Sequence, residues 1–186
     1  LDRPTTSQEL KQLRSWYYES NELRNAMLKG VGLLQSKIGL LRHEAQTDPL
    51  TCLHNRRSLD IRLSQLMAQR CPFAVLAIDI DHFKRVNDEF GHDIGDLVLQ
   101  SLAKLLVDAT REGDVVARTG GEEFIVIMPK VTAKRAYQLA ERLRMQVSEY
   151  YIEPVGCINV SIGISGWPLE QLSIEDVMKL ADQALY

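Results

Sequence analysis

The stretch FAVLAIDID, residues 73–81, is a run of apolar side chains that ends in two acids. A short apolar run of this kind predicts a buried central strand. Alternate side chains of a strand lie on opposite faces, so Asp79 and Asp81 share one face while Ile80 lies on the other. An acid near the buried end of a strand needs a partner, because burying a charge costs free energy. Two acids at a strand end therefore favour a metal site, although a strand that runs out into solvent would show the same letters.

The stretch RTGGEEFIVIMP, residues 118–129, predicts a β-hairpin whose turn is followed by two acids. Residues 114–119 and 122–129 are its expected strands, and we expect Gly120 and Gly121 to supply the positive φ of a two-residue turn. Acids beside such a turn are usually only solvated. If the hairpin pairs with strand 73–81, however, Glu122 or Glu123 completes a carboxylate cluster whose oxygen ligands suit Mg²⁺ together with substrate phosphates.

The rest of the chain alternates helices and strands without a glycine-rich dinucleotide fingerprint. Periodic apolar positions predict helices over residues 55–69, 94–110, 131–150 and 173–186, and a strand over 157–165. Ser173 is the expected cap of the last helix, with Asp176 in capping-box spacing. This order predicts an α+β fold in which helices pack against a central, mostly antiparallel sheet.

The composition limits the classes of protein that fit. The chain has 186 residues and is 45% hydrophobic, which is enough to form one hydrophobic core. Its formal net charge of -3 gives no overall positive potential that would attract nucleic acid. We therefore expect a small phosphorylated partner and no nucleic acid. Cys52, Cys71 and Cys157 form no CxxC pair and suit a cytoplasmic protein with reduced thiols. The opening LDRPTT has neither an initiator Met nor a signal peptide, so we expect a piece of a longer chain, whose membrane anchoring stays open.

Residues 1–46 form an expected N-terminal helical stalk, and residues 47–186 the globular domain. Within the stalk, steps of three and four residues predict a coiled-coil seam. The seam residues are Leu10, Leu13, Tyr17, Ser20, Arg24, Met27, Val31, Leu34, Ile38, Leu41 and Ala45. Polar Ser20 and Arg24, with Gly30, Gly32 and Gly39 nearby, weaken this seam. A single helix packed on its own domain, or a helix that docks a regulatory protein, would use the same apolar stripe.

The stretch HFKRVNDEFGHDIGD, residues 82–96, follows the strand acids and contains residues suited to a nucleotide. Backbone amides of a turn at His82 and Phe83, with the Lys84 ammonium, can hold phosphate oxygens. Asn87 and Asp96 offer an amide and a carboxylate that can pair with a guanine edge. Taken singly, each of these residues has an ordinary role as surface charge, cap or first-turn acid.

Five motifs in order resemble the GGDEF domain of diguanylate cyclases, in its GGEEF variant. They are DPLTCLHNRR (48–57), DIDHFKRVNDEFGHDIGD (79–96), RTGGEEF (118–124), VSIGIS (160–165) and ADQALY (181–186). The resemblance covers about residues 46–186. It implies a ferredoxin-like, palm-type domain that condenses two GTP into cyclic di-GMP and two pyrophosphates.

The resemblance also implies a role for each matching position. Its implied metal ligands, for Mg²⁺ or Mn²⁺, are Asp79, the Ile80 carbonyl, Glu122 and Glu123. Its implied catalytic residues are Glu122, which helps to activate the attacking 3′-hydroxyl, with Glu123 and Lys84. Its implied GTP contacts are Phe83, Lys84, Asn87, Asp96, Gly120 and Gly121, the two glycines allowing close approach of the backbone. Because one domain holds one GTP, two domains must face each other as a homodimer.

Two further family features affect the expected regulation. The sequence REGD contains Arg111 and Asp114 in an RxxD motif that resembles the product-inhibition site of these cyclases. Family members usually continue past ADxALY with xAKxxGRN, and this sequence stops at Tyr186, so we expect the C-terminal end of the domain to be truncated. The alternative to an active cyclase is a catalytically silent receptor for GTP or cyclic di-GMP, regulated through a partner on the N-terminal helix.

Overall fold

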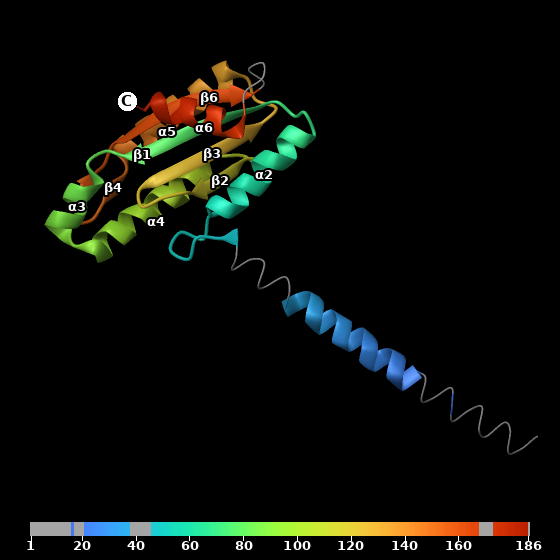
Figure 1. Cartoon of the computed structure of the whole chain (residues 1–186). Coiled ribbons are helices and arrows are strands. Elements are labelled where there is room, and N and C mark those ends of the chain that lie inside the picture. The colour runs from blue at the N-terminus through green and yellow to red at the C-terminus, as the bar shows by residue number, and fades with distance from the viewer. Residues whose placement is uncertain (1–15, 17–20, 38–45, 168–172, 186) are drawn as a thin grey trace, which may run out of the picture. The chain divides into compact units, whose positions relative to one another are not determined.

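The computed structural model describes residues 16, 21–37, 46–167 and 173–185. Its contacts divide the chain into two units, Leu1–Glu44 and Ala45–Tyr186. The first unit contributes a helix, and the second contains the sheet and the helices that cover it (Figure 1). None of the helices within the described ranges combines the length and the apolarity that a membrane span requires.

Residues 21–37 are helical, and their apolar side chains are exposed. Of the predicted seam, Arg24, Met27, Val31 and Leu34 are described, while Leu10, Leu13, Tyr17, Ser20, Ile38, Leu41 and Ala45 lie outside the described residues, as does Gly39. Met27 and Leu34 are 64% and 62% exposed. Within its own unit this helix therefore leaves its apolar stripe uncovered.

A four-stranded antiparallel sheet forms the centre of the second unit, in the order β2-β3-β1-β6. Its strands are β1 (Phe73–Ile80), β2 (Val115–Arg118), β3 (Glu123–Pro129) and β6 (Val160–Trp167). β1 lies between β3 and β6, which confirms the predicted central strand. The antiparallel sheet flanked by helices confirms the predicted α+β fold (Figure 1).

The two faces of β1 belong to two different cores. Leu76, Ile78 and Ile80 lie in a cluster with residues of α4 (His92–Ala109) and α5 (Ala133–Glu149). Val75 and Ala77 lie in the other cluster, with residues of α2 (Arg56–Ala68) and α6 (Ile174–Gln183). Since both faces of β1 are covered, nearly every position of the strand must be apolar, as its sequence shows.

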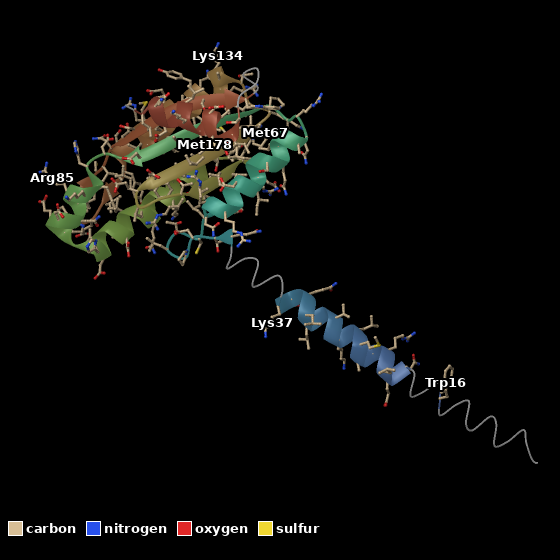
Figure 2. All side chains as sticks on the ribbon, in the orientation of Figure 1. Trp16, Lys37, Met67, Arg85, Lys134 and Met178 are labelled. Atoms are coloured by element: carbon tan, nitrogen blue, oxygen red, sulfur yellow. The ribbon has the colours of Figure 1, made fainter. Side chains whose placement is uncertain are left out.

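The helices α2 and α6 cover the same face of the sheet. In Figure 2, Met67 on α2 and Met178 on α6 lie over this face, and both pack against the same core cluster. Asn55 caps α2 by accepting a hydrogen bond from the Ser58 amide. Ser173 and Asp176 form a capping box at the start of α6, as the sequence predicts. Both helices therefore begin at the residues that their side-chain caps specify.

A helix that was not predicted, α3 (Phe83–Phe90), follows β1 directly. Phe83 and Val86 are buried, and Phe90 packs against the same core, so the apolar spacing of three and four residues is helical. His82 precedes the helix with a φ of 59°, and Gly91, with a φ of 87°, joins α3 to α4. α4 begins at His92, two residues before the predicted start of 94. The sequence does not predict α3 because the helix is short and contains few apolar residues.

The hairpin between β2 and β3 is present, but its glycines differ from the prediction. Arg118 pairs with Phe124, and the Thr119 amide donates to the Glu123 carbonyl over 3.0 Å. Gly120 and Gly121 are not among the glycines with positive φ, so the predicted left-handed turn is wrong. The loop is longer than two residues, and longer loops do not require that geometry. A Cβ on Gly120 would lie 2.5 Å from Glu123 Oε2, but this atom ends a flexible, exposed side chain that can move aside, so packing does not require the glycine.

The predicted strand 157–165 is shifted in the structure. Cys157 belongs to a small hairpin of β4 (Tyr151–Ile152) and β5 (Gly156–Cys157), in which it pairs with Tyr151. β6 then begins at Val160 and continues to Trp167. The three cysteines are free thiols.

Candidate active site

The acids of the two predicted motifs meet at one end of the sheet. β1 and β3 pair in a register that sets Asp79 directly opposite Glu123. Opposite residues of an antiparallel pair place their side chains on the same face, about 5 Å apart at Cβ. Glu122 immediately precedes β3 in the hairpin loop. The condition set by the sequence, pairing of the hairpin with strand 73–81, is therefore met.

The crowding of acids changes the protonation of Asp79. Burial raises the pKa of Asp79, and the charges of Glu122 and Glu123 raise it further, with additional contributions from Asp81 and Asp182, to about 6. The ordinary value is 3.8. A carboxylate in this position is therefore held ionised at neutral pH against the repulsion of its neighbours, which a cation would relieve.

Asp81 has a protein partner of its own. The Ser161 hydroxyl donates a 2.7 Å hydrogen bond to Asp81 Oδ1, and the Asp81 amide donates to the Asn159 carbonyl over 3.0 Å. Ser161 is the β6 partner of Asp79, so this bond places Asp81 on the Asp79 side of the sheet. Asp81 is thereby tied to β6.

The donors at this end of the sheet fit a hard divalent cation only in part. Asp79, Glu122, Glu123 and the Ile80 carbonyl offer oxygen atoms alone, which is the preference of Mg²⁺ and Mn²⁺. Among the described residues, no group of three or more His, Cys, Asp or Glu is close enough to form a ready cage. Mg²⁺ commonly uses one or two carboxylates plus substrate phosphates, and the Asp79–Glu123 pair can supply that number.

The predicted nucleotide contacts lie on α3 and α4. Phe83 is buried in the core, so only its backbone is available to a ligand, while Lys84 and Asp96 are exposed and Asn87 is half-buried. The first amides of α3, which belong to Phe83 and Lys84, lie at the helix N-terminus, where amides are free to bind anions. The structure thus brings the predicted phosphate contacts to the start of α3, directly after the acids of β1.

Gly95 sets the distance between α3 and α4. A Cβ built on Gly95 would overlap Asn87 Oδ1 and would lie 3.3 Å from Phe83 Cζ. The absence of that Cβ leaves room for the Asn87 amide against α4, next to Asp96. The pair predicted to bind guanine therefore comes from two helices that meet at one glycine.

A cavity beside the acids contains groups to which the sequence analysis gave no role. It measures about 650 Å³ and is bordered by α2, α6, β1 and the start of β3. Glu123, Thr119, Arg56, Lys179 and Asp182 line it. Asp182 lies within the ADQALY motif but is far in sequence from the other acids, so only the fold brings it near Asp79.

The two RxxD residues form an ion pair beside a second hollow. Arg111 Nε lies 3.2 Å from Asp114 Oδ1, and Arg111 Nη2 donates to the Pro129 carbonyl over 2.7 Å. The Asp114 side chain is 4% exposed, so it is held under the arginine. A hollow of about 310 Å³ beside them is also lined by Arg135 and Arg142 of α5. The sequence contained no signal for these two arginines, because they lie more than twenty residues downstream.

Ionisation of Asp79 makes the stability of the metal-free domain depend on pH. The pKa of Asp79 is higher in the folded state than in the unfolded state, so ionisation of Asp79 lowers the free energy of unfolding. This destabilisation is absent below about pH 4 and complete above the folded pKa of about 6. Asp79→Asn is therefore expected to raise the unfolding temperature by a few degrees at pH 8 and by less at pH 5, in buffer with chelator. Asp108→Asn, at an exposed position of α4, is the matched control. An equal effect of Asp79→Asn at both pH values would contradict the assignment.

The fold and the site together define the class of this protein. The strand order of the antiparallel sheet and the helices that flank it are those of a ferredoxin-like, palm-type α+β domain. Residues 45–186 match the family model described as diguanylate cyclase, GGDEF domain. The chain belongs to the GGDEF family.

Relatives and solved structures agree with this assignment. The diguanylate cyclase DgcP of Pseudomonas aeruginosa is 40% identical over 170 residues, which cover 87% of this chain and 25% of DgcP. The coiled coil and GGDEF domain of DgcB from Caulobacter crescentus, in complex with c-di-GMP, superpose with a TM-score of 0.77 at 29% identity, covering 94% of this chain and 92% of that one. The diguanylate cyclase SiaD, in complex with its activator SiaC from Pseudomonas aeruginosa, superposes with a TM-score of 0.73 at 28% identity, covering 96% and 72%. The chain spans a quarter of the length of DgcP.

Proposed function

We propose that this chain is the catalytic part of a bacterial diguanylate cyclase, which condenses two GTP into cyclic di-GMP and two pyrophosphates in the cytoplasm. The observation that carries the proposal is the pairing of Asp79 with Glu123 across β1 and β3, with Glu122 adjacent. Family membership supports the same reaction. A silent receptor would not need these acids to be kept together against their repulsion.

The proposed chemistry is an in-line attack of the 3′-hydroxyl of one GTP on the α-phosphorus of the other. Asp79, the Ile80 carbonyl, Glu122 and Glu123 are the proposed ligands of Mg²⁺ or Mn²⁺. When bound, the cation would neutralise charge on the phosphates and on the leaving pyrophosphate. Glu122 is the proposed acceptor of the proton of the attacking hydroxyl, and release of pyrophosphate completes each transfer.

The same model assigns the GTP contacts. Amides at the start of α3, at Phe83 and Lys84, hold phosphate oxygens together with the Lys84 ammonium. Asn87 and Asp96 bind the guanine edge, since a carboxylate accepts from N1–H and the 2-amino group. Gly120 and Gly121 let the hairpin backbone approach the nucleotide; a side chain at Gly121 would meet no protein atom within 4 Å, so space remains there for a ligand.

Gly95→Ala tests the guanine contact. The added methyl group must displace the Asn87 amide, so the KM for GTP is expected to rise about tenfold, as for the loss of one hydrogen bond, while kcat changes little. Initial rates over a range of GTP concentrations measure both constants. Alanine has a higher helix propensity than glycine, so a rise in KM could not be caused by a weakened helix α4. Gly166→Ala, where an added Cβ makes only an ordinary contact, is the control; an unchanged KM in Gly95→Ala would remove Asn87 from the site.

Two copies are needed because each domain binds one GTP and the two nucleotides must face each other. We propose that the helix at residues 21–37 pairs with its counterpart in a second copy, or docks a regulatory protein, through the exposed stripe that includes Met27, Val31 and Leu34. Light scattering of the chain with and without residues 1–46 tests this. An unchanged monomer–dimer equilibrium would exclude coiled-coil pairing.

Arg111 and Asp114 are the proposed inhibitory site for cyclic di-GMP. The Arg111 side chain is 57% exposed and can turn to a phosphate or a guanine edge, while the ion pair between its Nε and Asp114 anchors it. Arg111→Ala is expected to leave the initial rate unchanged. The concentration of cyclic di-GMP needed for half-maximal inhibition is expected to rise about tenfold. Glu112→Ala, at the exposed neighbouring position, is the control. An unchanged inhibition curve would leave REGD as a surface ion pair.

The direct test of the proposed function is chromatographic. The longest available form of the protein is incubated with GTP and Mg²⁺, and cyclic di-GMP and pyrophosphate are quantified. We expect both products, with two pyrophosphates for each cyclic di-GMP. Binding of GTP or cyclic di-GMP by calorimetry without any product would favour the receptor instead.

A further inference from the structure

The guanidinium of Arg118 bridges the hairpin loop and the segment that precedes α2. Arg118 Nε and Nη2 both donate to the carbonyl oxygen of Gly121, over 3.2 and 2.8 Å. Arg118 Nη1 donates to both carboxylate oxygens of Asp48, over 3.1 and 3.3 Å. The two side chains are only 14% and 18% exposed. All three guanidinium nitrogens thus donate hydrogen bonds.

Asp48 is itself fixed before it meets Arg118. Its carboxylate accepts from the Thr51 amide over 2.8 Å and from the Thr51 hydroxyl over 2.7 Å. Burial raises the pKa of Asp48, but the hydrogen bonds from Thr51 and Arg118 outweigh it and hold the pKa below the ordinary value. Asp48 therefore stays ionised at neutral pH and serves as a fixed anchor for the guanidinium.

The segment around Asp48 is tied to β2 by its backbone. The His54 amide donates to the Val116 carbonyl, and the Arg118 amide donates to the His54 carbonyl over 2.9 Å. The Cys52 amide closes the turn onto the Asp48 carbonyl over 2.9 Å. Asp48 is thus held at a constant place beside the strand that leads into the hairpin.

The bond to Gly121 determines the direction of the next peptide group. The only cis peptide bond among the described residues is Glu153–Pro154, so the peptide that joins Gly121 to Glu122 is trans. In a trans peptide the C=O and the N–H point in opposite directions. When Arg118 holds the Gly121 carbonyl, the Glu122 amide must point away from the guanidinium, and the start of the Glu122 and Glu123 backbone is oriented with it.

We propose that Arg118, anchored on Asp48, is a positioning residue that orients the Gly121–Glu122 peptide and so sets the geometry of the two hairpin acids. Glycine at 121 has no side chain to fix this peptide, and the backbone hydrogen bond across the loop, from Thr119 to Glu123, does not involve Gly121. The inference deepens the proposed function and rests on it, because the acids that Arg118 positions are those assigned to GTP and the metal.

Arg118→Lys separates positioning from charge. The lysine ammonium can keep an ion pair with Asp48 but has no planar fork to hold the Gly121 carbonyl at the same time. We expect kcat to fall about 10- to 100-fold, as for a small misplacement of reacting groups, with the KM for GTP unchanged. The half-saturating Mg²⁺ concentration is expected to rise several-fold. Arg144→Lys, at an exposed arginine paired with Glu141 over 3.2 Å, is the matched control and should change none of these values.

Amide NMR of the same variants provides a readout that does not depend on turnover. In Arg118→Lys we expect the Glu122 amide resonance to move or broaden, both without ligand and during titration with Mn²⁺. The Thr119 amide should keep its protection from hydrogen exchange, which shows that the hairpin is still paired. The combined variant Asp48→Asn/Arg118→Lys should be little worse than Arg118→Lys alone, because the two residues act as one unit.

Two outcomes would overturn the inference. One is an unchanged Glu122 resonance and Mg²⁺ dependence in Arg118→Lys. The other is a loss of activity that only follows a loss of folded protein, measured by thermal unfolding. If the wild-type protein makes no cyclic di-GMP at all, the proposed function fails, and the NMR comparison alone then decides whether Arg118 positions the hairpin.

Discussion

Glu123→Ala is expected to reduce synthesis of cyclic di-GMP about 1,000-fold or more, the largest effect among the single substitutions at this site. Glu123 lies directly opposite Asp79 and lines the cavity beside the sheet, so its loss removes one of two paired carboxylates. The remaining acids cannot replace it, since Glu122 lies outside β3 and has no strand partner opposite it. The measurement is the rate of product formation from GTP at saturating Mg²⁺.

The fold should survive this substitution. Glu123 is exposed, and removal of a charge near Asp79 relieves repulsion, so the unfolding temperature in chelator should not fall. Glu141→Ala, at a glutamate of α5 far from β3 in sequence, is the control for loss of an acid. Activity of Glu123→Ala within a few-fold of the wild-type value would show that the metal assignment is wrong.

Gly163→Ala is expected to destabilise the domain by about 3 kcal/mol, because it forces two packed backbones apart. A Cβ on Gly163 would overlap the Ala181 carbonyl oxygen and would lie 3.0 Å from the Leu185 amide. Both obstacles belong to the backbone of α6 and its end, which cannot rotate away as a side chain could. Urea unfolding measures the change in the free energy of unfolding.

A control on the same strand separates this contact from strand propensity. At Gly166 the nearest atom to an added Cβ is the Phe73 carbonyl oxygen at 3.4 Å, an ordinary contact. Gly166→Ala should therefore leave the free energy of unfolding nearly unchanged or raise it slightly. If both variants are equally stable, α6 does not depend on the bare backbone of Gly163 for its place on the sheet.

The sequence alone determined the sheet and its acids because these depend on local patterns. The run FAVLAI, residues 73–78, has no polar face, so it must lie between two layers, and the structure buries β1 on both faces. The acids at its end and the hairpin at 118–129 follow from alternation and from turn residues. The cap of α6 at Ser173 is likewise a local signal. Helix α3 was missed because eight residues with three apolar positions give little periodic signal.

Only the tertiary structure decided what depends on contacts between distant segments. The register of β1 against β3 sets Asp79 opposite Glu123, and a shift of one residue would turn the acids to opposite faces. Packing of α6 brings Asp182 near Asp79, and the Asp48–Arg118 ion pair joins residues seventy positions apart. The hairpin glycines show the same division: the sequence predicts a left-handed turn there, but the longer loop forms without a positive φ at either glycine. Local patterns fix which face a residue takes, whereas distances between acids, amides and cations arise only when separate elements pack.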